Sequence, residues 1–133
     1  MSEDKSAIVN GTFVNASFKH AVEICKFVKG KKLNSAIGLL SNVEEKKIAI
    51  PMTRFKKKVP HKPGIGPGRY PVKASKAIRG LLESAGKNAE AKGLNTDKLV
   101  IKVLEANRAL SARRAARFRR GKLTNIKIMV SEE

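Results

Sequence analysis

Positive charge is distributed unevenly along this chain of 133 residues, and the distribution limits what the chain can fold into. Residues 51–80 carry nine basic side chains and no acidic one, and residues 111–133 carry seven basic and two acidic side chains. Residues 1–50 and 81–110, in contrast, have roughly balanced charges. The sequence therefore predicts a single domain over 1–133, with one globular body and two cationic appendages.

The total charge indicates the class of partner. The chain has 29 basic and 11 acidic side chains, a formal net charge of +18, which fits a polyanion such as nucleic acid or an anionic membrane surface. No apolar run approaches the roughly 20 residues that cross a bilayer, and the first residues lack the apolar core of a signal peptide, so we expect no membrane insertion. Hydrophobic residues make up 41% of the chain, enough for a packed core.

The balanced segments predict an α+β body, in which three helices pack on a small antiparallel sheet. We expect the first helix over 17–29, with Ser17 as its N-cap, and the second from Asn34 as N-cap to about residue 43. The third helix is expected to begin at Pro71 and to stop near Gly93.

Alternating apolar residues predict two strands, one from residue 99 and one ending at residue 130. An antiparallel pairing with Leu99 opposite Val130 would place six apolar side chains on one face, which could pack on the helices. These six are Leu99, Ile101, Val103, Ile126, Ile128 and Val130. Residues 8–15 could add a third strand, and the hairpin over 98–131 is expected to extend beyond the body where arginines replace the apolar residues.

The outer part of this hairpin is the first cationic appendage. Residues 108–122 contain seven basic groups and no acidic one, and such a density of like charge requires a counter-charge such as a phosphate-lined slot. A solvated amphipathic helix is the alternative, and Phe118 could either stack on a base or cap a small apolar cluster. The candidate residues are Arg108, Arg113, Arg114, Arg117, Phe118, Arg119, Arg120 and Lys122.

The second appendage is a basic loop, which spans residues 51–70 and is too rich in proline and glycine to predict regular structure. Its glycines do not have the spacing of a nucleotide-binding loop. We expect the loop, from about residue 53, to lie on a partner with its cations on phosphates, although a flexible basic linker remains the alternative. The expected phosphate contacts are Lys56, Lys57, Lys58, Lys62 and Arg69.

Enzymatic and metal chemistry find little support in the sequence. His20 and His61 are the only histidines, and neither has a cysteine or carboxylate partner at catalytic or metal-binding spacing. Cys25 is the only cysteine, which excludes an internal disulfide and indicates an intracellular protein; its place on an apolar helix stripe predicts a core position. We expect no enzyme, no metal site and no cofactor.

Several motifs occur in a characteristic order. They are SFKHA (17–21), VKGKK (28–32), IPM (50–52), GRYPVKASKA (68–77), NAEAKGL (88–94), LVIKVLEAN (99–107) and the arginine-rich hairpin. This order resembles the universal large-subunit ribosomal protein twenty-two family, called seventeen in eukaryotic naming, and is most similar to the archaeal form. The resemblance covers essentially the whole chain, although the hairpin is several residues shorter than is typical.

The resemblance implies a structural protein of the large ribosomal subunit in the cytoplasm. Its body would bind ribosomal RNA near the polypeptide exit site, and its hairpin would line the tunnel beside the nascent polypeptide, opposite ribosomal protein four. A free nucleoid or RNA-chaperone protein is the alternative that also explains the charge. The expected RNA-binding residues, which include the loop cations named above, are Lys19, His20, Lys29, Lys31, Lys32, Arg54, Lys56, Lys57, Lys58, His61, Lys62, Arg69, Lys73 and Lys76.

Overall fold

The computed structural model describes residues 6–55, 57–109 and 123–132. Its elements are β1 (Ser6–Val14), α1 (Phe18–Val28), α2 (Leu33–Glu44), β2 (Ile50–Pro51), β3 (His61–Lys62), β4 (Gly66–Arg69), α3 (Val72–Ala91), a 3-10 turn (Thr96–Lys98), β5 (Leu99–Arg108) and β6 (Thr124–Glu132). The predicted α+β class is confirmed. No helix in the described ranges is both long and apolar enough to cross a membrane.

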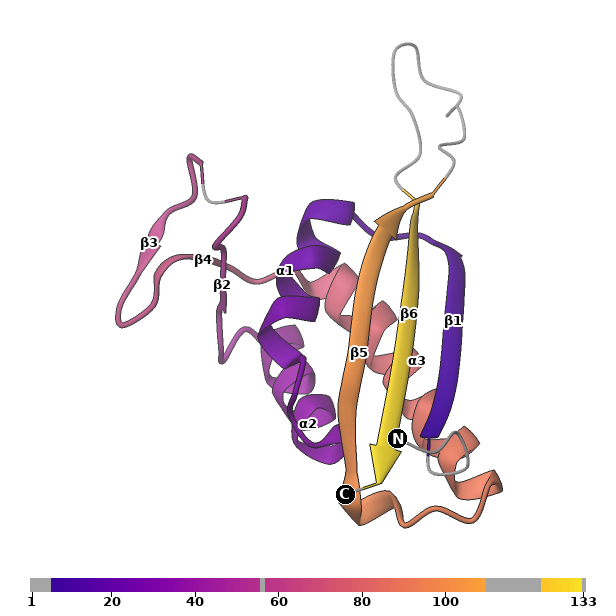
Figure 1. Cartoon of the computed structure of the whole chain (residues 1–133). Coiled ribbons are helices and arrows are strands. Elements are labelled where there is room, and N and C mark those ends of the chain that lie inside the picture. The colour runs from indigo at the N-terminus through magenta and orange to yellow at the C-terminus, as the bar shows by residue number, and fades with distance from the viewer. Residues whose placement is uncertain (1–5, 56, 110–122, 133) are drawn as a thin grey trace.

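The main sheet is antiparallel, in the order β1-β6-β5. In Figure 1, α3 crosses behind this sheet, while α1 and α2 lie beside β5. Alternate residues of β6, from Thr124 to Val130, are buried, because successive side chains of a strand point to opposite faces and one face meets the helices. The fully buried residues Ile24 of α1 and Ile78 of α3 belong to the core between the two layers. The expected third strand is therefore confirmed as β1.

The predicted register between β5 and β6 is wrong. Leu99 pairs with Glu132, two residues beyond the expected Val130, and Ile101 takes the position opposite Val130. A bulge between Ile101 and Val103 then shifts the pairing by one residue. Because one extra residue reverses the faces of the residues that follow it, apolar alternation alone could not predict the later positions.

The bulge decides which side chain enters the core. Leu104, opposite Ile128, is buried, whereas Val103 is only half-buried, so Leu104 occupies the inner place that we predicted for Val103. The bulge begins where the strand bonds outside the sheet: Ile101 donates its backbone N–H to the Lys31 carbonyl at 3.0 Å and accepts from the Gly30 N–H at 3.1 Å. The turn between α1 and α2 thus holds the lower part of β5.

The three helices are confirmed, with one corrected start. Ser17 is the N-cap of α1, and α3 follows Pro71 and ends just before Gly93. The second helix begins at Leu33 after Lys32, not after Asn34. Leu33 is buried in the core, so burial of its side chain outweighs the capping preference of Asn34, which is exposed in the first turn.

The expectation that the basic loop has no regular structure is also wrong. Three short strands form a second, small sheet, the loop sheet, in the order β2-β4-β3 (Figure 1). Its prolines and glycines are compatible with pairing because Pro51 and Pro67 lie in strands only two and four residues long. Gly64 and Gly66, with φ of 81° and 77°, permit the turn that joins β3 to β4.

Candidate RNA-binding surface

The basic loop is attached to α1 through a buried carboxylate. Glu23 is only 1% exposed, and its side chain accepts hydrogen bonds from the backbone N–H of Thr53 and, at 3.1 Å, from that of Arg54. The Thr53 hydroxyl lies 3.4 Å from the same carboxylate. A buried charge needs such donors, and here the donors are the loop backbone, so Glu23 fixes where the loop leaves the body.

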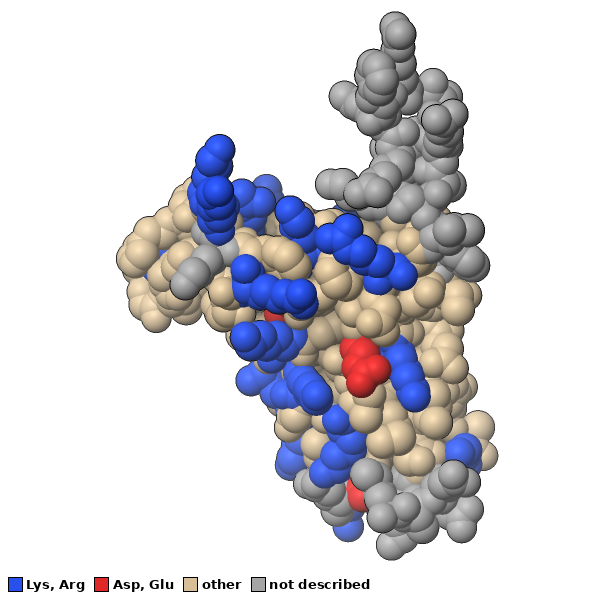
Figure 2. Space-filling model, turned by 45° about the horizontal axis from the view of Figure 1, so that its top comes forward, with Lys and Arg blue, Asp and Glu red and all other residues tan. Residues whose placement is uncertain are grey.

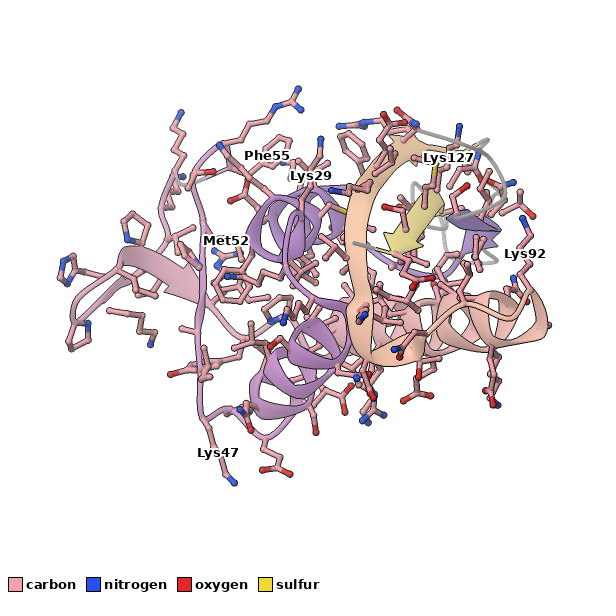
Figure 3. The ribbon with its side chains drawn as sticks, turned by 60° about the horizontal axis from the view of Figure 1, so that its bottom comes forward. Lys29, Lys47, Met52, Phe55, Lys92 and Lys127 are labelled. Atoms are coloured by element: carbon pink, nitrogen blue, oxygen red, sulfur yellow. The ribbon has the colours of Figure 1, made fainter. Side chains whose placement is uncertain are left out.

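Apolar contacts fix the base of the loop. Ile50 and Met52 are buried at 0% and 3% exposure, and the Met52 N–H donates to the Pro67 carbonyl at 2.9 Å. The side chains that follow these anchors, Arg54 and Phe55, lie over the beginning of α1. In Figure 3, Phe55 and Lys29 lie where the loop meets α1, whereas Lys47 extends from the opposite side of the molecule.

Two phenylalanines bring together cations from three segments. Phe18 of α1 and Phe55 of the loop form an edge-to-face pair, with ring centroids 6.2 Å apart. Lys19 Nζ and Arg54 Cζ lie 5.7 Å and 5.1 Å from the Phe55 centroid, and Arg108 Cζ lies 4.8 Å from that of Phe18. All three distances are within the range of cation–π attraction. We call these five residues the aromatic cluster; it joins α1, the basic loop and the end of β5.

Other predicted cations contact partners outside this cluster. Lys62 Nζ lies 5.4 Å from the Tyr70 ring, and Lys31 Nζ lies 5.5 Å from the Phe27 ring. Lys73 donates to the Asn15 side chain at 3.2 Å. The exposed members of the predicted set are Lys19, Lys29, Lys32, Arg54, Lys57, Lys58, His61, Arg69, Lys73, Lys76 and Arg108, and the half-buried ones are His20, Lys31 and Lys62.

The remaining predicted residues cannot be placed. They are Lys56, Arg113, Arg114, Arg117, Phe118, Arg119, Arg120 and Lys122, all of which lie outside the described residues. The last described link of the hairpin is the hydrogen bond from the Ala109 N–H to the Leu123 carbonyl, at 3.1 Å. Arg108 is therefore the one predicted hairpin residue that the described structure ties to the body.

Basic side chains form a broad band on the face seen in Figure 2, running from the basic loop along one flank of the molecule. Acidic side chains occupy only small areas of that face. The ion pairs Lys47–Glu45 (2.7 Å) and Arg79–Glu44 (3.2 Å) use cations outside the predicted set. Among the described residues, no group of three or more His, Cys, Asp or Glu side chains is arranged to hold a metal ion.

A hollow of about 460 Å³ lies between α1 and β5, next to the aromatic cluster. Half-buried or buried side chains form its floor, and three cations stand at its rim. Its lining residues are Val22, Cys25, Lys26, Lys29, Arg54, Leu104, Glu105, Ala106 and Asn107. Only Lys29 and Arg54 of these residues were predicted from the sequence.

Four residues that form or support this surface were not predicted from the sequence: Lys26, Phe18, Phe55 and the buried Glu23. The two phenylalanines carry a readable signal, because each is directly flanked by a basic residue, in FKH and RFK. Glu23 carries a weaker one: it is the only acid in α1 and stands between the apolar Val22 and Ile24. Its partner lies 30 residues away in sequence, so the role of Glu23 required the tertiary structure.

Comparison with known proteins identifies the family of the chain. The family model for ribosomal protein L22p/L17e matches residues 9–131. The large ribosomal subunit protein uL22 of Thermoplasma acidophilum is 42% identical over 123 residues, which cover 87% of this chain and 82% of the relative. Those of Methanococcus aeolicus and Methanocaldococcus jannaschii are each 44% identical, covering 84% and 86% of this chain and 74% and 75% of the relatives. Because the family model spans nearly the whole chain and the archaeal relatives align over most of it, the chain belongs to the ribosomal protein L22p/L17e family.

Proposed function

We propose that this chain is a structural constituent of the large ribosomal subunit that binds the subunit's RNA through the basic loop, α1 and the start of α3. Family membership makes it a ribosomal, non-enzymatic protein of the cytoplasm, with ribosomal RNA and neighbouring ribosomal proteins as partners. The aromatic cluster is the observation that carries the RNA interface. It holds Lys19, Arg54 and Arg108, which come from three separate segments, in one place on the surface.

Phosphate contacts should dominate the affinity. The affinity of a protein for single-stranded or duplex nucleic acid falls with salt, with a log–log slope of about −0.7 to −0.9 per phosphate neutralised. Changing Lys57 and Lys58 together to Gln should therefore flatten the slope by roughly 1.4 to 1.8 units. Lys46 and Lys47 offer a matched control, because they are also adjacent exposed lysines, and Lys46 and Lys58 share a φ of 61°.

The salt experiment measures binding of the purified protein to large-subunit RNA across a salt series. The Lys46→Gln, Lys47→Gln control should keep the wild-type slope, since Lys47 lies on the opposite side of the molecule from Phe55 (Figure 3). An unchanged slope in the loop variant would mean that Lys57 and Lys58 do not contact phosphates. Equal affinity for duplex DNA would instead favour a free nucleic-acid-binding protein.

The assignment to the subunit has its own test. A tagged copy produced in its native cells should sediment with large subunits and remain there through a high-salt wash that removes loosely attached basic proteins. Recovery of the tagged protein mainly in the wash, with intact subunits, would contradict a structural role.

For the hairpin, we propose that residues 108–122 line the nascent-chain exit tunnel, opposite ribosomal protein four. The proposal is supported by seven basic groups in a segment without acids, and by β5 and β6, which continue side by side up to Ala109 and Leu123. Replacing residues 110–120 by a short turn removes none of the described core side chains. The shortened protein should enter subunits and alter the passage of nascent chains or of tunnel-binding inhibitors; failure to enter subunits would make the hairpin the main assembly anchor.

A further inference from the structure

The hollow between α1 and β5 differs from the rest of the basic surface because it has an apolar floor. Val22 and Cys25 of α1 face Leu104 and Ala106 of β5 across it. Burial raises the pKa of the Cys25 thiol to about 12, so this group is a neutral thiol and does not oppose an apolar ligand. Such a floor is unsuited to phosphate but suits the flat face of a ring.

The edge of β5 supplies polar groups to the same hollow. β5 is an edge strand of the main sheet: it pairs with β6 on one side, and on the other side it bonds near its start to the turn at residues 30–32. Ile101 bonds outward to residues 30–31, and Ala109 bonds inward to Leu123. With the bulge taken into account, antiparallel alternation turns the backbone N–H and C=O of Leu104 and Ala106 toward the outer edge, which the hollow adjoins. A donor and an acceptor are therefore presented beside the apolar floor.

The rim of the hollow provides positive charge beside the apolar floor. Lys26, Lys29 and Arg54 stand around the opening, and all three side chains are exposed. Glu105 is the one acid in the lining and is exposed as well, so positive charge exceeds negative charge at the rim. The aromatic cluster continues from Arg54, so further cations and ring faces lie directly beside the hollow. Apolar floor, strand edge and cationic rim together match one nucleotide: a ring with hydrogen-bonding edges, and a phosphate on each side.

We propose that this hollow binds a single unpaired base of RNA, with the adjoining phosphates on Lys26, Lys29 and Arg54. This proposal rests on the function proposed above and adds base contact to what would otherwise be a purely phosphate-binding surface. The base lies between Val22 and Ala106 and uses the outer edge of β5 at Leu104 and Ala106. An extended peptide could use the same edge, but the three rim cations favour a polyanion over a peptide strand.

The test separates the base from the phosphates. The full-length protein is titrated with a hexamer of uridylate and with an abasic hexamer of the same ribose-phosphate chain, while backbone amide signals are followed by NMR. The base-bearing hexamer should bind about five-fold or more tightly, because the contact of the base with the apolar floor is lost in the abasic chain. Its specific signal shifts should lie at residues 22–29 and 104–107.

A filling variant shows whether the hollow is responsible. Ala106→Ile adds an aliphatic side chain that suits a strand and should reduce the difference between the two hexamers to less than two-fold. Val22→Leu, on the facing helix, is the second variant if Ala106→Ile lowers the thermal unfolding temperature substantially. Ala91→Ile is the matched control, because Ala91 is exposed at the end of α3, away from the hollow, and it should leave the difference intact.

Equal affinity of the wild-type protein for the two hexamers would overturn the proposal, as would a difference that survives both filling variants. Shifts at 104–107 that arise with a short peptide strand and not with RNA would assign the hollow to a protein partner. Recovery of the wild-type protein in salt-washed large subunits is measured separately. Failure of base binding in the hollow and failure of the ribosomal assignment would therefore give different results.

Discussion

The main sheet and the loop sheet are both antiparallel and three-stranded, yet they are held in different ways. The strands of the main sheet are nine or ten residues long, and each contributes buried side chains to the core shared with α1 and α3. The strands of the loop sheet have two to four residues. The loop sheet joins the core at one end, through the buried side chain of Ile50. Besides the buried side chains at its base, the loop sheet is attached through a polar link, the Glu23 carboxylate.

This difference separates stability from recognition. A strand that buries one face contributes to the free energy of unfolding of the whole body, whereas a small sheet attached by a few bonds can loosen without unfolding the rest. Part of the predicted RNA-binding set follows that division, since Lys57, Lys58, His61 and Arg69 lie on the basic loop, whereas most core side chains belong to the helices and the main sheet. Changes in the two sheets should therefore have separable consequences.

The largest effect is expected in the main sheet. Ile128, fully buried in the central strand β6, leaves a cavity when changed to Ala, and the free energy of unfolding should fall by about 2–5 kcal/mol. Urea denaturation measures this loss. Met129→Ala, on the half-buried opposite face of the same strand, is the control and should cost clearly less. Equal losses at the two positions would show that the helices do not define the buried face.

An intermediate effect is expected at the link between the sheets. Glu23→Ala removes the acceptor of the Thr53 and Arg54 N–H groups. This change should lower the free energy of opening of the loop sheet by about 1–3 kcal/mol. Hydrogen exchange should accelerate over residues 50–69 much more than over β6. Glu23→Gln keeps one acceptor oxygen and should cost less, and Glu83→Gln on the exposed face of α3 should change neither region. Uniform acceleration in both sheets would mean that the loop sheet is not an independent unit.

A smaller effect is expected in the aromatic cluster. Phe55→Leu removes the ring that faces Lys19 and Arg54, and RNA affinity should fall by about 0.5–1 kcal/mol while the body remains stable. Phe27→Leu is the counterpart: this ring also faces a lysine, but it packs against the core. It should lower the unfolding free energy more than the RNA affinity. If both variants changed the same property, the proposed division would fail.

The smallest effect is expected for chemical modification of Cys25, whose thiol should react only when the body opens. At pH 8 the buried thiol is protonated, so a thiol reagent should modify it about a thousandfold or more slowly than an exposed cysteine. Glu23→Ala should leave that rate nearly unchanged, because Cys25 belongs to the body. Since folding raises the thiol pKa from 9.0 to about 12, the stability that this group contributes is complete below about pH 9 and falls as the pH rises toward 12. Fast labelling in the native protein at pH 8 would contradict its burial.

Several features of the fold were readable from local sequence. The apolar periodicity of α1 and α3 and the alternation in β6 each depend on residues within one element, and burial of a continuous stripe requires little else. The two acid-free segments likewise identified a polyanion-binding protein, because a high density of like charge needs an external counter-charge. The motif order indicated the family before any contact was known.

The remaining features depend on contacts between distant segments. The bulge in β5 follows bonds from Ile101 to the turn after α1, and it exchanges Val103 for Leu104 in the core. No local pattern predicts it, because both residues are apolar and either could face inward. The start of α2 at Leu33 has the same origin: a core position, set by the rest of the fold, outweighed a local capping preference.

The candidate RNA-binding surface likewise has a part that the sequence alone predicted and a part that depends on the tertiary structure. Residue type and density alone identified the basic loop and its lysines as candidates, because charge acts over distance and does not need a precise arrangement. The tertiary structure decided where these charges meet: Glu23 holds the loop on α1, and Phe18 and Phe55 bring Arg54 beside Arg108. Apart from the contact between the adjacent residues Arg54 and Phe55, these short-range contacts exist only when the chain is folded, since they join residues 30 to 90 positions apart in sequence.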